Sequence, residues 1–203
     1  YEEILNNLNA EVSCLVLANP NSPVGDILDL STIQKILIKS NKLNIPVLID
    51  EAYIEYADQE SCIKFLKDYD NLVISRTFSK ACGCAGLRIG YLLGNNEIME
   101  VLNKFIPTYE ITSLSAKFGI HLLNNCKIID DYVKLIKDEK KIIGKKCKEY
   151  NIDVILNHIN TIFIKPFNLE SVIKFLDNKE VFYRTRKLPK DESDWLAIVL
   201  YPE

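Results

Sequence analysis

The sequence predicts an α/β protein: a mostly parallel sheet with helices, followed by a smaller α+β unit. Over the first hundred residues, short apolar runs alternate with segments of helical periodicity, as in βαβ units. The apolar runs are continuous, which is typical of strands in a parallel sheet that is covered on both faces. After Glu149 four strand-like runs and one helical stretch follow, and they indicate the second, smaller unit.

The large sheet is predicted to take its strands from four apolar runs. The first strand ends at a turn that begins with Asn19, and a helix follows with Ser31 as its N-cap. The spacing of Ile33, Ile36 and Leu37 predicts the buried face of that helix. The four strand-like runs are residues 12–17, 46–49, 72–75 and 89–93.

A long helical segment separates the two units. Apolar residues follow a three-four spacing from Leu122 to Cys147, interrupted by Lys140, so we expect one long helix or two helices stacked end to end. The division is placed in this segment, with a large domain over residues 1–135 and a small domain over residues 136–203. The small domain is predicted to have strands at 153–156, 161–164, 180–183 and 195–200 and a helix at 169–176.

The composition excludes several classes of function. The chain has 203 residues and a net charge of −3, which leaves no basic field for a nucleic-acid backbone. No apolar run reaches the roughly 18 residues needed to cross a membrane, and the first residues do not resemble a signal peptide. Six cysteines without a CxxC pair and two histidines offer few metal ligands. We therefore expect a cytoplasmic protein with free thiols and no metal, nucleic-acid or membrane partner.

Polar side chains follow three consecutive strands at the point where each is predicted to end. Asn21 and Ser22 lie in the turn after the first strand, Asp50 ends the second, and residues 75–80 follow the third. Arg88 comes after a stretch of small side chains that lets a ligand approach the backbone. Each feature alone is common in loops and helix caps. Because ligands bind at the carboxyl ends of parallel strands, their order predicts one shared site.

Four segments in this order resemble the motifs of fold-type I pyridoxal-phosphate (PLP) enzymes. Within that group the chain is most similar to the histidinol-phosphate aminotransferases of class II. The resemblance implies the type I fold, with part of the PLP-binding large domain in residues 1–135 and the small domain in residues 136–203. The segments are residues 19–25 (Asn-Pro-Asn-Ser-Pro-Val-Gly), 50–53 (Asp-Glu-Ala-Tyr), 75–80 (Ser-Arg-Thr-Phe-Ser-Lys) and 85–90 (Ala-Gly-Leu-Arg-Ile-Gly).

The resemblance implies a chemical role for three residues. Lys80 would carry PLP covalently and move the proton at the substrate Cα. Asp50 would pair with the pyridinium nitrogen, and Tyr53 would hydrogen-bond the phenolate oxygen of the ring. A purely structural role stays open for Tyr53, which could simply pack.

Further residues are implied in holding the cofactor. Thr77, Ser79 and Arg88 would bind the 5′-phosphate through two hydroxyls and a guanidinium. Alternatives stay open, because Thr77 could cap a turn and Arg88 could pair with a surface carboxylate. The family usually has an asparagine immediately before the proline at position 23, where this chain has Ser22, and Asn21 could replace it only if the turn shifts.

Two departures from the family pattern bear on the reaction. Ala197 stands where the family usually has an arginine for the substrate carboxylate, and Arg184 or Arg186 could take over. The chain also lacks the N-terminal segments and the last helix of the family. We therefore expect an incomplete protein that exposes apolar surface on its sheet and aggregates or depends on a partner chain.

The leading hypothesis is a PLP-dependent aminotransferase that exchanges an amino group between a small, phosphorylated amino compound and a keto acid. The second is a PLP-dependent decarboxylase of a phosphorylated amino acid, similar to threonine-phosphate decarboxylases, because decarboxylation is compatible with the loss of an arginine at Ala197. The third is a non-catalytic remnant. Fold-type I enzymes place their sites at a dimer interface, so the resemblance also implies a homodimer.

Overall fold

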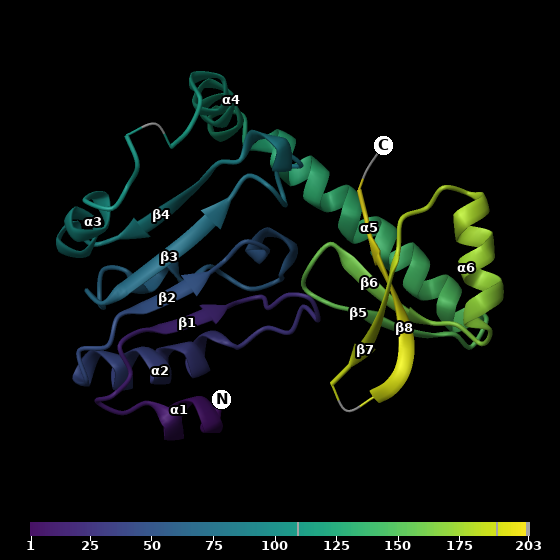
Figure 1. Ribbon diagram of the computed structural model, residues 1–203, viewed down its shortest axis with the longest axis horizontal. Coiled ribbons are helices and arrows are strands. Elements are labelled where there is room, and N and C mark those ends of the chain that lie inside the picture. Colours follow the sequence, from purple (N-terminus) through teal and green to yellow (C-terminus); the bar gives the residue numbers. More distant parts are fainter. Residues whose placement is uncertain (109, 190, 202–203) are drawn as a thin grey trace.

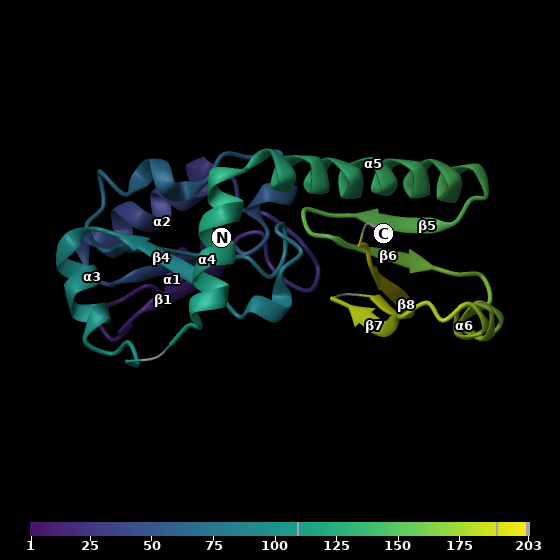
Figure 2. The ribbon, with the colours of Figure 1, turned by 90° about the horizontal axis from the view of Figure 1, so that it is seen from above.

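A computed structural model describes residues 1–108, 110–189 and 191–201. The chain forms two four-stranded sheets, one after the other along the sequence, with a long helix beside both (Figures 1 and 2). The strand order is β1-β2-β3-β4 in the first sheet and β5-β6-β8-β7 in the second. The long helix is α5 (Lys127–Glu149), which contacts β5 of the second sheet and the turn after β2 of the first.

The first sheet is largely parallel, as predicted. Its first three strands run in the same direction, and β4 pairs antiparallel with β3. The register aligns Ala18, Asp50 and Ser75 across the carboxyl ends of the parallel strands. Polar groups from separate segments therefore meet at one sheet edge. The strands are β1 (Leu15–Ala18), β2 (Val47–Asp50), β3 (Leu72–Thr77) and β4 (Gly90–Gly94).

Helix α2 (Leu30–Lys42) covers one face of this sheet, and α1 (Glu2–Asn7) packs beside it. Ile33 and Leu37 are fully buried against the strands, as the spacing predicts. The prediction that Ser31 is the N-cap is wrong. Asp29 caps the helix, because its carboxylate accepts hydrogen bonds from the Thr32 backbone N–H at 2.7 Å and from the Ser31 hydroxyl at 2.6 Å.

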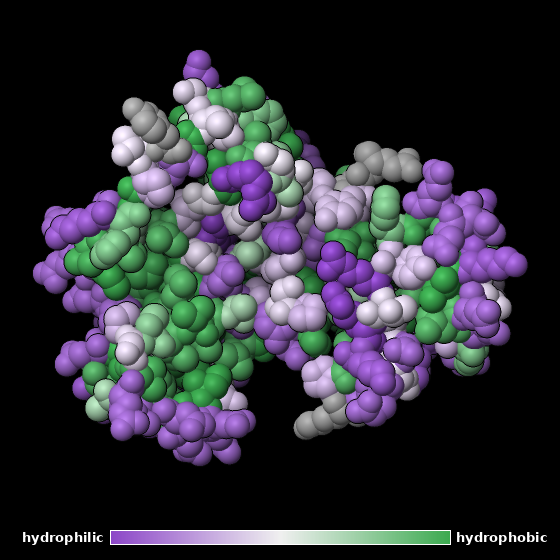
Figure 3. All heavy atoms as spheres, viewed as in Figure 1, coloured by the Kyte–Doolittle hydropathy of each residue, from purple (hydrophilic) through white to green (hydrophobic). Residues whose placement is uncertain are grey.

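The opposite face of the first sheet is only partly covered, so the expectation of a sheet covered on both faces is wrong for this chain. Val16 on β1 is 62% exposed and Leu92 on β4 is 40% exposed. Figure 3 shows apolar side chains gathered over this sheet. The continuous apolar runs indicate strands whose two faces could both be buried. In this chain, α2 and α1 pack on one of these faces. The expected exposed apolar surface is thus confirmed.

The helical segment predicted from Leu122 to Cys147 is split between two helices, α4 (Ser113–Asn124) and α5, near its N-terminal end. Helix α3 (Asn96–Asn103) is followed by α4, and α4 and α5 meet at a steep angle rather than stacking end to end (Figure 2). Asn125 ends α4, because its side-chain amide donates to the His121 carbonyl oxygen at 2.8 Å. The predicted division between residues 135 and 136 falls inside α5 and stays a prediction. No helix in the described ranges has the length and apolar composition of a membrane span.

The second sheet is antiparallel, and α6 (Leu169–Asn178) connects its strands β6 and β7. The prediction of a strand at residues 180–183 is wrong, because the strand in the structure starts at Arg184. This edge strand is mostly exposed and its sequence is Arg-Thr-Arg-Lys-Leu, so it has no apolar pattern to detect. The last strand also starts earlier than predicted. The strands are β5 (Asp153–Leu156), β6 (Thr161–Lys165), β7 (Arg184–Leu188) and β8 (Asp191–Val199).

Candidate active site

A cavity of about 480 Å³ lies at the carboxyl ends of β2 and β3. It brings together most of the residues predicted to bind the cofactor, although they are far apart in the sequence. The start of β4 also lines this cavity, because Gly90 lies beside Thr77 in the β3–β4 pair. The polar residues that line it are Asp50, Ser75, Arg76, Thr77, Ser79, Lys80 and Arg88.

Asp50 is held firmly at the end of β2. Its Oδ1 atom accepts hydrogen bonds from the Ser75 hydroxyl at 2.9 Å and from the Ala52 backbone N–H at 3.1 Å. The register with β3 explains the first contact, since Asp50 and Ser75 are direct neighbours across the two strands. Side chains alternate along a strand, so Asp50 points to the opposite face from Glu51. The carboxylate is therefore oriented toward the cavity that also contains Lys80.

Thr77, Ser79 and Arg88 also line this cavity. The Thr77 hydroxyl accepts the Ser79 backbone N–H at 3.1 Å, which tightens the turn leaving β3. Arg88 follows the short helix η3 (Ala85–Leu87), and its backbone is left-handed with φ 52°. An arginine in this conformation is uncommon, and such residues cluster at functional sites. These groups offer two hydroxyls and one guanidinium to an anion.

A second cavity, of about 640 Å³, lies between the two sheets. Ser22, Tyr53 and Lys80 line it from the side of the first sheet. The Lys80 ammonium group is 5.0 Å from the centre of the Tyr53 ring. Because Lys80 lines both cavities, the two cavities meet at its side chain. The residues of the second sheet that line it include Thr161, Phe163, Arg184, Arg186 and Ala197.

The second cavity is positively charged. Lys80, Arg184 and Arg186 line it, and its described lining residues include no carboxylate. Arg184 stands directly opposite Ala197 in the β7–β8 pair, so its guanidinium lies on the same face as the small alanine side chain. The lining of this cavity favours an anionic ligand.

Asn21 lies outside the lining of both cavities. Its Oδ1 atom accepts hydrogen bonds from the backbone N–H groups of Gly25 at 2.9 Å and Asp26 at 3.3 Å. Its side-chain oxygen therefore closes the turn after β1. Of the two predicted residues in this turn, Ser22 is the one that lines a cavity.

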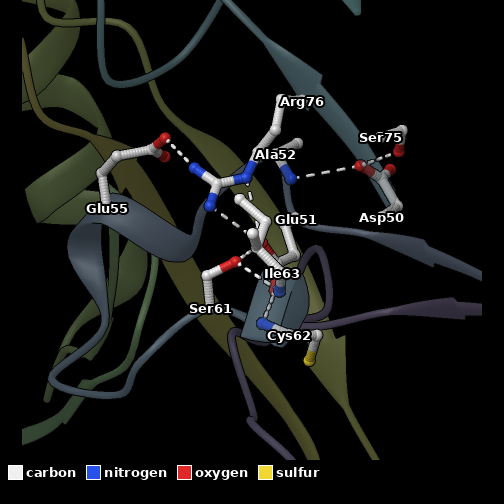
Figure 4. Close-up of polar contacts among 9 residues, drawn as sticks. All are labelled: Asp50, Glu51, Ala52, Glu55, Ser61, Cys62, Ile63, Ser75 and Arg76. Atoms are coloured by element: carbon white, nitrogen blue, oxygen red, sulfur yellow. Dashed lines mark hydrogen bonds and ion pairs between the residues drawn. The ribbon is translucent and has the colours of Figure 1, made fainter. Parts of the chain in front are cut away.

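Sequence reasoning missed a buried ion-pair cluster behind the site (Figure 4). Glu51 is fully buried, and its carboxylate accepts from the Arg76 Nε atom at 2.9 Å, the Ser61 hydroxyl at 2.6 Å and the Cys62 backbone N–H at 2.6 Å. The Arg76 Nη1 atom also donates to Glu55 at 2.6 Å. Burial raises the pKa of Glu55, which the Arg76 charge opposes. The predicted strands end at residues 49 and 75, so Glu51 and Arg76 lie in the segments after them, and no signal in the sequence indicated that they pair.

The cluster positions the segment that carries Tyr53. Glu51 precedes the turn that contains Tyr53, Glu55 lies in the following short helix η1 (Ile54–Tyr56), and both are paired with Arg76 on β3. The remaining short helix, η2 (Cys62–Phe65), is held to Glu51 by the hydrogen bonds that Ser61 and Cys62 donate to its carboxylate. The end of β2 and the end of β3 are thereby joined on the face opposite Asp50. This support orients both site-lining segments.

Comparison with known proteins identifies the family. The family model described as "Aminotransferase class I and II" matches residues 1–199. The chain belongs to this family. A relative named histidinol-phosphate aminotransferase, from Christiangramia forsetii, is 38% identical over 148 residues, which cover 73% of this chain and 41% of the relative. The chain spans about half the length of the curated relatives it matches.

Solved structures of the family share the fold. Histidinol-phosphate aminotransferase from Sinorhizobium meliloti, crystallised in complex with pyridoxal-5′-phosphate, matches with a TM-score of 0.75 at 22% identity and covers 93% of this chain and 53% of its own. L-threonine-O-3-phosphate decarboxylase from Porphyromonas gingivalis matches with a TM-score of 0.75 at 19% identity, covering 97% and 63%. The predicted fold, the type I fold of PLP-dependent transferases, is confirmed. Over the described residues, no group of three His, Cys, Asp or Glu side chains could hold a metal.

Proposed function

We propose that the protein is a PLP-dependent aminotransferase, similar to the histidinol-phosphate aminotransferases, that transfers an amino group between a small, phosphorylated amino compound and a keto acid. The observation that carries this proposal is the place of Lys80 at the junction of two cavities. One cavity offers the groups that a phosphorylated cofactor needs, and the other is large, positively charged and open to a substrate. Family membership and the named relatives support the same activity.

The residues of the smaller cavity fit PLP by their chemistry. Lys80 supplies an amine for the aldehyde, and Asp50 supplies a carboxylate for the pyridine nitrogen. Thr77, Ser79 and Arg88 would hold the phosphate. When bound, PLP supplies an electron sink for the charge that develops at the substrate Cα as its proton leaves.

The protein residues then have defined tasks. The Lys80 amine would take the proton from the substrate Cα and return it to the cofactor carbon, which requires its position between the two cavities. The Asp50 carboxylate would keep a proton on the pyridine nitrogen, and its contacts with Ser75 and Ala52 hold it in that orientation. Tyr53 would hydrogen-bond the ring oxygen beside Lys80. Ser22 would contribute a hydroxyl from the same wall of the larger cavity.

The test is a single-turnover reaction with the PLP-loaded protein and a phosphorylated amino alcohol. We expect the cofactor absorbance to shift from above 400 nm to about 330 nm as the amino group is transferred and a carbonyl product appears. A subsequent addition of keto acid should reverse the shift. Loaded protein whose spectrum stays unchanged with a panel of such amines would contradict the proposal.

Arg184 and Arg186 are proposed to bind the anionic group of the substrate. Both line the larger cavity, and the small Ala197 side chain leaves space before them. We expect Arg184→Gln and Arg186→Gln each to raise KM by about tenfold to a hundredfold, since a hydrogen bond to a charged group is lost. Steady-state kinetics measures the change.

The matched control for this pair is Lys187→Gln. Lys187 follows on the same strand, faces the other side and forms an exposed ion pair with Glu192. The KM of the Lys187→Gln variant should stay within about twofold of the wild-type value. A double variant of Arg184 and Arg186 with the wild-type KM would show that the anion is bound elsewhere.

A decarboxylase of a phosphorylated amino acid is the second candidate. Ala197 offers no charge to clamp a carboxylate in the plane of the cofactor, and a solved decarboxylase shares the fold. Release of carbon dioxide without keto-acid formation would favour this reaction over amino transfer.

We also propose that the protein acts as a homodimer in the cytoplasm. Free thiols at all six cysteines support a reducing compartment. Helix α4 exposes Leu114 at 71%, Ile120 at 59% and Leu123 at 51%, and such apolar surface favours association. Light scattering should report a dimer or larger species, and a monodisperse monomer would contradict this.

A further inference from the structure

Lys140 is buried in the middle of α5, where it interrupts the apolar seam of that helix. It is 8% exposed. Its ammonium group donates to the backbone carbonyl oxygens of Asn157 at 2.5 Å and Ile159 at 2.6 Å, and to the Asn157 Oδ1 atom at 3.0 Å. Burial lowers the pKa of Lys140 to about 8. All three ammonium protons are thus used, which offsets the cost of burying the charge.

These contacts fix the orientation of the Asn157 side chain, in the turn between β5 and β6. Its Oδ1 atom accepts from Lys140 and from the Ile159 backbone N–H at 3.3 Å. Its Nδ2 atom donates to the Val24 carbonyl oxygen at 2.8 Å. Because Lys140 holds the oxygen end of the amide, the nitrogen end is directed at Val24.

The turn at Asn157 is in direct contact with the turn after β1. Figure 1 shows the loop after β1 reaching the β5–β6 turn. The His158 backbone N–H donates to the Gly25 carbonyl oxygen at 3.0 Å. Gly25 has φ +83°, and a Cβ atom there would lie 2.7 Å from the Asn157 Cβ and Cγ atoms. Glycine is therefore required for this close approach.

Both turns lead directly into the walls of the larger cavity. Ser22 and Pro23 line one wall beside Lys80, and Thr161 lines the wall contributed by the second sheet. The contact between the two turns therefore joins the segments that lead into the two walls. The described residues that line the smaller cavity all belong to the segment 50–90 of the first sheet and its loops, so this cavity does not depend on the contact.

We propose that Asn157, oriented by Lys140, is a positioning residue that fixes the second sheet against the turn after β1 and so sets the width of the substrate cavity beside Lys80. The inference rests on the proposed function, which assigns this cavity to the substrate. Loss of the contact would therefore weaken substrate binding and leave cofactor attachment intact.

Asn157→Asp tests the proposal most cleanly. The carboxylate keeps the shape of the side chain and the contact with Lys140, but it replaces the Nδ2 donor with an oxygen that faces the Val24 carbonyl oxygen. We expect KM for the amino substrate to rise about tenfold or more, kcat to change less than about threefold, and PLP to attach to Lys80 as in the wild type. Amide hydrogen exchange should become faster in residues 21–26 and 157–160 and stay unchanged in residues 72–80.

Lys140→Met is the second variant, with Lys141→Met as its matched control. Lys141 is the next residue of α5, with a side chain that is 77% exposed and paired with Asp138. Lys140→Met should show the same faster exchange in both turns as Asn157→Asp. Lys140→Arg should keep the wild-type exchange rates, because it retains a charged donor. Lys141→Met should also keep the wild-type rates. If Lys140→Met does not fold, Asn157→Asp alone decides.

Two outcomes would overturn the proposal. One is a wild-type KM in Asn157→Asp, whether or not the exchange rates change. The other is faster exchange throughout the chain, residues 72–80 included, in every variant that breaks the contact, which would mean a general structural role. A wild-type protein that takes no PLP on Lys80 would instead overturn the proposed function, and the exchange measurement would still decide the inference.

Discussion

Replacing Lys80 with alanine is expected to lower kcat by on the order of 10⁴-fold. The amine would attach the cofactor and move the Cα proton, and no other described residue can replace it. Arg76, Arg88, Arg184 and Arg186 supply the other positive charges that line the two cavities, but a guanidinium stays protonated and forms no such bond. Single-turnover kinetics of the PLP-loaded protein would measure the loss.

The matched control is Lys67→Ala, which removes an exposed lysine away from both cavities. It should keep the wild-type kcat within about twofold. Retention of more than a tenth of the activity by Lys80→Ala would show that the proton is moved by another group. Secondary structure measured by circular dichroism should be the same for both variants.

Replacing Arg76 with methionine is expected to lower the free energy of unfolding by about 3–5 kcal/mol. The guanidinium pairs with Glu51 and Glu55, and Glu51 is fully buried. Without Arg76, the Glu51 carboxylate keeps the Ser61 and Cys62 donors but loses its counter-charge. A buried charge without its partner is strongly destabilising. Urea unfolding followed by circular dichroism would measure the difference.

Two further variants distinguish the stability lost with the Arg76 ion pairs from the stability lost through any substitution of a charged residue. Lys64→Met breaks the exposed pair with Glu60 and should cost less than about 1 kcal/mol. Glu51→Gln in the Arg76→Met background should recover part of the lost stability, since no unpaired carboxylate remains. A loss below about 1 kcal/mol in Arg76→Met, or additive losses in the double variant, would contradict the role assigned to the cluster.

The sequence was sufficient to predict the first sheet and the sheet edge at which the candidate site residues meet. Continuous apolar runs gave each strand, and the parallel order brought Asp50, Thr77 and Lys80 to one edge, as expected. The partly covered face of the sheet was not foreseen from the strand pattern itself, because that pattern describes what a strand can bury and not which segment covers it.

Features that depend on tertiary contacts could not be predicted. The charged edge strand β7 has no apolar alternation, so its start at Arg184 was missed, and with it the pairing opposite Ala197. The partners of Arg76 and Lys140 are 25 and 17 residues away in the sequence. Lys140 interrupts an apolar pattern, which indicates a buried partner without identifying it. Arg76 follows the predicted strand, where a charged side chain is common.

The most direct test of the central claim is to map the residue to which PLP becomes attached. The protein is incubated with PLP, reduced with borohydride, digested and analysed by mass spectrometry. We predict one phosphopyridoxyl group per chain, on Lys80, and none on Lys80→Ala. A protein that carries no such group, or one distributed over exposed lysines while Lys80 stays unmodified, would contradict the account.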